Sequence, residues 1–173
     1  MGDHPVREAL QAAWKQVRAD YDVGRVNSER ILQSCLFRRL HDELPGYTIF
    51  CEPLIRTEKL GLTVPDMLVV ADVQVVAVVE LKFVPHAYPV FEEDIAKLAS
   101  FGSQKGEFPV FIDPVTGKFK KPDLSCAADC LLVFAVIGRH DAKAVDAEFL
   151  WSKIVDECAS SRFVPLVHAV PGQ

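Results

Sequence analysis

Residues 64–83 read VPDMLVVADVQVVAVVELKF, a pattern that predicts two strands joined by a tight reversal. The first strand covers residues 64–71, the reversal is Asp72-Val73, and the second strand covers residues 74–83. The second strand is a nearly unbroken run of β-branched residues, which is typical of a strand that is covered on both faces. We therefore expect this strand to lie at the centre of a sheet.

The two strands carry three charged side chains, Asp66, Glu80 and Lys82. Glu80 and Lys82 are two residues apart and therefore point to the same face. If the hairpin reverses about Val73, Asp66 faces Glu80 with the two Cβ atoms roughly 5 Å apart. A two-residue turn would instead place Asp66 opposite Val79 and turn it away from Glu80. Both registers are compatible with the sequence.

Two carboxylates in the first of these registers would repel each other, and a divalent cation would relieve that repulsion. A simpler interpretation pairs Glu80 with Lys82 as an ion pair on one face of the strand. In that case Asp66 would be a residue at the start of a strand that accepts backbone N–H groups.

The remaining chain alternates between helical and extended patterns around these strands. The predicted helices cover residues 5–20, 28–44, 91–102 and 145–158, and the other predicted strands cover residues 48–55, 131–138 and 164–168. Asn27 or Ser28 is expected to cap the second helix. Because no repeat or linker interrupts this order, we predict a single domain over residues 1–173 with an α/β fold, a central mixed sheet flanked by helices.

The composition excludes several classes of protein. Half of the 173 residues are apolar and 25% are charged, which excludes a disordered or collagen-like chain. The formal net charge of −5 argues against strong non-specific binding of nucleic acid, although it permits a local basic surface. The longest apolar stretch, residues 67–79, is too short to span a membrane, and the N-terminus lacks a signal pattern. We therefore expect a cytoplasmic protein with no membrane partner.

The five cysteines form an odd number, which favours free thiols in a chain without an export signal. Cys126 and Cys130 are four residues apart, a spacing that would place them on one face of a helix. They could supply half of a zinc site, but no second Cys/His pair lies nearby in the sequence. Small core residues are the favoured interpretation.

The dipeptide Pro65-Asp66, followed by the tripeptide Glu80-Leu81-Lys82, resembles the motif of the PD-(D/E)XK nuclease superfamily. Glu29 lies on the inner face of the preceding helix, where that superfamily also carries an acidic residue. The order helix, three strands, helix, strand over residues 25–138 is similar to the restriction-endonuclease-like αβββαβ core. The chain is therefore expected to share that core.

The resemblance implies a metal-dependent nuclease that hydrolyses phosphodiester bonds of DNA or RNA, with DNA favoured over RNA. Asp66 and Glu80 would hold Mg²⁺ or Mn²⁺, with the backbone carbonyl of Leu81 as a further ligand. Lys82 would contact the scissile phosphate and the attacking water, and Glu29 would hold a metal-bound water or orient Lys82. From the residues alone, Glu29 could equally favour the N-terminus of its helix through the helix dipole.

Two other functions remain open. The fold could serve as a catalytically inactive binding or structural module, or the carboxylates could belong to an unrelated metal hydrolase with a small substrate. A nuclease of this size is expected to need a homodimer or a partner subunit to grip and select its target.

Further lysines are candidates for contact with nucleic acid. Lys118, Lys120 and Lys121 form the densest basic cluster and could grip a nucleic-acid backbone, or they could belong to a solvated hairpin. Lys97 could touch the substrate, but its spacing of three residues from Asp94 predicts a solvated ion pair on the helix surface.

Overall fold

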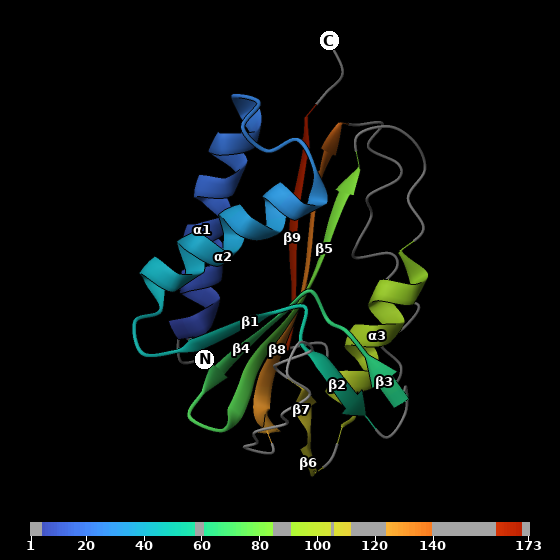
Figure 1. The fold of residues 1–173 in the computed structure, drawn as a ribbon. Coiled ribbons are helices and arrows are strands. Elements are labelled where there is room, and N and C mark those ends of the chain that lie inside the picture. Colours follow the sequence, from blue (N-terminus) through green and yellow to red (C-terminus); the bar gives the residue numbers. More distant parts are fainter. Residues whose placement is uncertain are drawn as a thin grey trace.

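The computed structural model describes residues 5–57, 61–84, 91–104, 106–111, 124–139 and 162–170. These residues form a mixed β-sheet with helices on both faces (Figure 1). The helices are α1 (Pro5–Asp22), α2 (Glu29–Glu43) and α3 (Glu92–Gly102). The strands are β1 (Thr48–Cys51), β2 (Leu54–Thr57), β3 (Gly61–Thr63), β4 (Met67–Ala71), β5 (Gln74–Val84), β6 (Glu107–Phe108), β7 (Val110–Phe111), β8 (Leu124–Arg139) and β9 (Phe163–Val170).

The main sheet has the strand order β1-β4-β5-β8-β6, and β9 also pairs with β8. Strands β1, β4 and β5 form an antiparallel meander, whereas β8 runs parallel to β5 and β9 runs parallel to β8. A smaller sheet has the order β3-β2-β7. The chain order α2, β1, β4, β5, α3, β8 is the predicted αβββαβ arrangement, and the predicted α/β fold class is confirmed.

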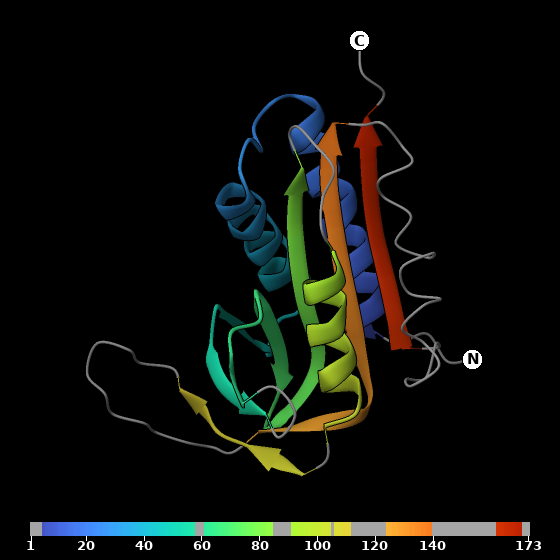
Figure 2. The same ribbon diagram turned by 90° about the vertical axis from the view of Figure 1, so that its right-hand side faces the viewer.

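The core consists of two apolar layers on opposite faces of β5 (Figures 1 and 2). Ala77, Val79 and Leu81 pack with α1 and α2, while Val78 packs with α3. All four are buried, as expected for a strand in the middle of a sheet. The charged residues of β5 therefore lie in a strand whose neighbouring residues are apolar and covered on both faces.

The ends of the predicted helices agree closely with the structure. Helix α1 extends two residues beyond its predicted end, and α2 begins directly after Ser28. Of the two predicted caps, Ser28 is the residue used, because its hydroxyl accepts the N–H of Ile31 at 3.3 Å. Among the described residues, no helix combines the length and the apolar character that crossing a membrane requires.

Several strand boundaries differ from the prediction. The strand expected over residues 48–55 is broken into β1 and β2, which belong to different sheets. The break has a backbone cause: Glu52 adopts a φ of +49°, and Pro53 has no N–H for a ladder. Pro65 likewise accounts for β4 starting at Met67 and not at residue 64.

Strand β8 begins at Leu124, seven residues before the predicted strand, so Cys126 and Cys130 lie on a strand and not on a helix. The pairing with β5 is irregular there, because Val75 is opposite Cys126 while Ala77 is opposite Leu131. The helix predicted over residues 145–158 lies outside the described residues.

The hairpin between β4 and β5 combines the two predicted registers. The turn has two residues, because Ala71 pairs with Gln74, and Asp72 takes a φ of +54°. A β-bulge then leaves Val76 without an opposite residue and shifts the register by one. Beyond the bulge Met67 pairs with Val79, and one further step along both strands leads to Asp66 and Glu80.

Candidate functional site

The site begins where β5 extends beyond Met67, the first residue of the antiparallel strand β4. Two carboxylates bind the backbone of β5 along this edge. Asp66 Oδ2 accepts the N–H of Leu81 at 2.6 Å, and Glu29 Oε2 accepts the N–H of Phe83 at 3.1 Å. Since Leu81 and Phe83 are two residues apart, their N–H groups point to the same side of the strand. The edge of β5 thus brings together an acidic residue from α2 and one from the start of the hairpin.

The segment that carries Asp66 is held in place by hydrogen bonds to the backbone carbonyl of Asp66. This oxygen accepts the side-chain amide of Gln33 on α2 at 3.0 Å and the N–H of Glu52 at 2.9 Å. Burial raises the pKa of Asp66, although the hydrogen bond from Leu81 acts in the opposite direction. The Asp66 carboxylate is therefore positioned by its surroundings while its charge is disfavoured.

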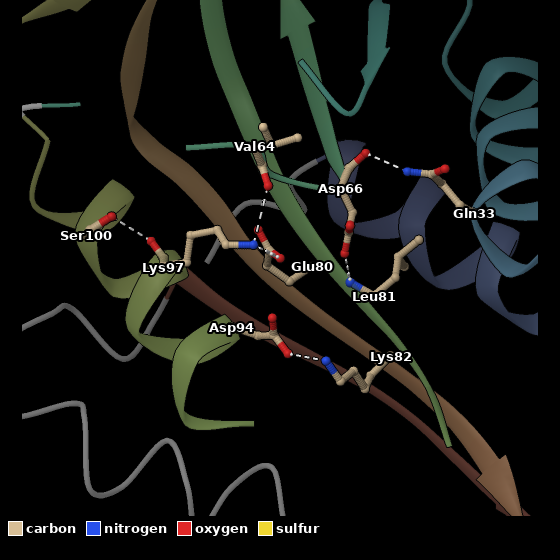
Figure 3. Close-up of polar contacts among 9 residues, drawn as sticks. All are labelled: Gln33, Val64, Asp66, Glu80, Leu81, Lys82, Asp94, Lys97 and Ser100. Atoms are coloured by element: carbon tan, nitrogen blue, oxygen red, sulfur yellow. Dashed lines mark hydrogen bonds and ion pairs between the residues drawn. The ribbon is translucent and has the colours of Figure 1, made fainter. Parts of the chain in front are cut away.

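Glu80 is the most buried charged residue of the site, with 1% of its surface exposed. Its Oε2 lies 2.7 Å from Lys97 Nζ, which also donates to the carbonyl of Val64 at 3.3 Å (Figure 3). Its Oε1 is buried and has no hydrogen-bond partner among the described residues. Burial, and then the negative charge of Asp66, raise the pKa of Glu80 to about 8, although Lys97 acts to lower it.

Lys82 pairs with Asp94 of α3, at 2.9 Å between Nζ and Oδ2 (Figure 3). Burial alone would lower the pKa of Lys82, but the hydrogen bond and charge of Asp94 outweigh it, so that this pKa is raised. Glu80 and Lys82 share the face that looks toward α3, as predicted from their spacing. The ion pair considered between them is not formed in the structure, because each binds a residue of α3.

The ion pair predicted between Asp94 and Lys97 on the surface of α3 is wrong. Both side chains reach across to β5, Asp94 to Lys82 and Lys97 to Glu80. Helix α3 packs on this face of the sheet, so residues three apart on its inner side meet the charged residues of β5. The sequence spacing identified the two residues but not their partners.

The donor atoms fit a hard divalent cation. Two carboxylates, Asp66 and Glu80, approach each other closely enough that the charge of Asp66 raises the pKa of Glu80. The orphaned Oε1 of Glu80 is a free ligand atom in a buried position. The carbonyl of Leu81 points to the same edge as its N–H, toward Asp66, because both groups of a strand residue face one neighbour. Oxygen ligands of this kind suit Mg²⁺ or Mn²⁺.

Glu29 is brought to the same edge of β5, where it accepts the N–H of Phe83. Its negative charge acts to raise the pKa of Lys82, but no hydrogen bond or ion pair joins the two side chains among the described residues. Lys118, Lys120 and Lys121 lie outside the described residues. In the part of the chain that the structure describes, no group of three or more His, Cys, Asp or Glu side chains could hold a metal ion. Any metal ligation here would therefore draw on backbone carbonyls or water besides the two carboxylates.

Two further contributors, Gln33 and Val64, were not predicted. Gln33 is one turn after Glu29 on α2, a spacing that would have placed both on one helix face. Val64 contributes only its backbone carbonyl, which no side-chain pattern reveals.

No protein-family profile matches the chain, and no curated protein matches it. Among solved structures, the chain is similar to NucC from P. aeruginosa ATCC27853 in its cAAA-bound form. The two are 13% identical with a TM-score of 0.47, over 94% of this chain and 75% of that one.

Proposed function

We propose that this chain is a metal-dependent nuclease of the PD-(D/E)XK kind, which hydrolyses phosphodiester bonds of DNA or RNA. One observation carries the proposal: Asp66 and the buried Glu80 converge at the edge of β5, and Oε1 of Glu80 has no hydrogen-bond partner in the described ranges. A buried carboxylate oxygen whose lone pairs accept no hydrogen bond is costly unless something binds it. A divalent cation is the ligand that such an oxygen favours most.

In this proposal Asp66, Glu80 and the carbonyl of Leu81 hold Mg²⁺ or Mn²⁺. The bound ion supplies Lewis acidity, which acidifies water and offsets the charge that develops on the phosphate. The chain positions these ligands through contacts to the backbone. Asp66 is fixed by the Leu81 N–H, and its segment is tied to α2 by Gln33.

Lys82 is the candidate for contact with the scissile phosphate. Asp94 holds its ammonium on the same face of β5 as Glu80. Glu29 acts on the strand by accepting the N–H of Phe83, and its negative charge also acts to raise the pKa of Lys82. Its role in the proposal is to fix the part of β5 that carries Lys82.

Binding of the polynucleotide would draw on local positive charge, because the formal net charge of the chain is −5. We assign Lys97, Lys118, Lys120 and Lys121 to this role, with DNA favoured over RNA. A homodimer or a partner subunit would complete the grip on the substrate. The proposed setting is the cytoplasm.

A second candidate is a binding or structural module that shares the fold and lacks catalysis. Specific contacts favour it: both Lys82 and Lys97 are neutralised by carboxylates of the chain itself. A lysine bound in this way is less available to a phosphate.

The deciding experiment incubates the protein with supercoiled plasmid, single-stranded DNA and RNA, with Mg²⁺, Mn²⁺ or a chelator. Cleavage should require the cation and fall at least about 100-fold in Asp66→Asn, Glu80→Gln and Lys82→Gln, as for the loss of one charge-stabilising group. Glu93→Gln, on the exposed side of α3, and Lys15→Gln, exposed on α1, are the matched controls and should retain activity.

Other results would select the alternatives. A wild-type protein that neither cuts nor binds a divalent cation would establish the module. One that binds the cation at Asp66 and Glu80 but cuts no polynucleotide would point to a metal hydrolase with a small substrate. Circular dichroism of each variant distinguishes a lost site from a lost fold.

A further inference from the structure

The ammonium of Lys97 lies where the proposed site would bind a cation. Its Nζ is 2.7 Å from Glu80 Oε2 and 3.3 Å from the carbonyl oxygen of Val64. The charge of Lys97 also reaches Asp66, whose pKa it acts to lower. Lys97 therefore contacts or influences both acidic residues, and its partners are carboxylate and carbonyl oxygens, the same ligand types that a hard metal ion takes.

The two side chains of the Glu80–Lys97 contact differ in their exposure to solvent. Glu80 has 1% of its side chain exposed, whereas Lys97 has 23% exposed. When Glu80 is ionised, as metal binding requires, its buried charge needs a positive group beside it. Lys97 can leave, because its side chain is long, flexible and partly open to solvent.

An ammonium and a divalent cation cannot share the position. Both would use oxygens of the same carboxylate, and their like charges repel at such short separations in a buried place. Lys82 provides the contrast, since it lies on the same face but is bound by Asp94 and makes no contact with Glu80 among the described residues.

We propose that Lys97 is a built-in competitor for the divalent cation: its ammonium is hydrogen-bonded to Glu80 in the metal-free chain and leaves when the metal binds. This inference rests on the proposed metal site at Asp66 and Glu80. According to this inference, Glu80 binds either the cation or Lys97 but not both. The second contact between α3 and β5, from Asp94 to Lys82, persists in both states. The released ammonium then becomes available on the face where a phosphate would lie.

The test follows Lys97 directly. The wild-type protein, without nucleic acid, is titrated with Mg²⁺ by calorimetry and labelled with an amine-acylating reagent, with and without Mg²⁺. Mass spectrometry then gives the labelling rate at each lysine. We expect saturating Mg²⁺ to raise the rate at Lys97 by about tenfold, equivalent to about 1.4 kcal/mol of lost protection. The labelling rates at Lys82, which lies beside the proposed metal site, and at Lys15, on α1, should change far less.

A second variant makes the cause explicit. In Glu80→Gln the labelling rate of Lys97 should already be high and should not respond to Mg²⁺. If instead Mg²⁺ binds to the wild type and the rate at Lys97 does not rise above that at Lys82, the inference is overturned while the metal site stands.

The remaining outcome concerns the site itself. If the wild type binds no Mg²⁺, the inference requires that Lys97→Met binds it, because the competitor has been removed. Failure of both proteins to bind Mg²⁺ overturns the metal site and the inference together, which is distinguishable from failure of the competition alone.

Discussion

Glu80→Gln should remove a large pH dependence from the stability of the metal-free protein. The substitution keeps the shape of the side chain but cannot ionise. The Gln side chain fills the same space without the charge that holds the Lys97 ammonium, and its amide would occupy the position of Oε1, which has no partner in the described part of the chain. The perturbation therefore changes the charge of one buried group with little change in packing.

The magnitude follows from the pKa of Glu80, which burial raises from its ordinary value of 4.5 to about 8. Between these pH values the folded protein keeps a proton that the unfolded chain releases, so the free energy of unfolding falls as the pH rises. Each pH unit in this window contributes about 1.4 kcal/mol, which amounts to roughly 5 kcal/mol over the whole window. The loss of unfolding free energy is absent below the pKa of the unfolded chain, 4.5, and complete above that of the folded protein, about 8.

The assay is urea unfolding of the wild type and Glu80→Gln across the same range of pH, in the presence of a chelator. The wild type should lose stability relative to the variant by several kcal/mol between these limits. Glu93→Gln, which removes an exposed carboxylate of α3, controls for the change in net charge. Parallel curves for the wild type and Glu80→Gln would refute the assignment of a buried, ionisable Glu80.

Three further substitutions test the fold, each by urea unfolding. Ser28→Ala removes the cap of α2 and should cost about 1 kcal/mol, whereas an unchanged midpoint would show that the cap contributes nothing. Gly138→Ala should cost about 1–3 kcal/mol, because the added Cβ would overlap the carbonyl oxygen of Val84; a neutral result would mean that these strands separate readily. Asp20→Asn removes the acceptor of two arginine side chains, whose hydrogen bonds lower the pKa of Asp20, and should cost under about 1 kcal/mol near neutral pH. That difference should vanish as the pH falls through the lowered pKa, and a difference that persists in acid would contradict the ion-pair explanation.

Much of the scaffold could be predicted from local patterns. The period of two in the second strand predicted that Glu80 and Lys82 share a face, and both look toward α3. The β-branched run predicted a central strand, and β5 lies between β4 and β8. These features follow from backbone geometry and solvent exposure, which neighbouring residues report directly.

The register of the hairpin could not be obtained in this way. The two-residue turn between Ala71 and Gln74, taken alone, would have turned Asp66 away from Glu80. The bulge at Val76 shifts the register and restores the juxtaposition. No glycine or other local signal marks that bulge within a run of valines, so it depends on how the whole sheet packs.

The pattern of residues along the chain established which charged groups lie on which face, because side-chain direction is a property of the local backbone. Which charges pair was settled by the packing of α3 against β5. Asp94 and Lys97 are close enough on the helix to bind each other, yet each binds a residue of the strand. An exposed pair between neighbours is worth little, whereas a buried carboxylate such as Glu80 needs a counter-charge, and burial exists only once the helix and the sheet have come together.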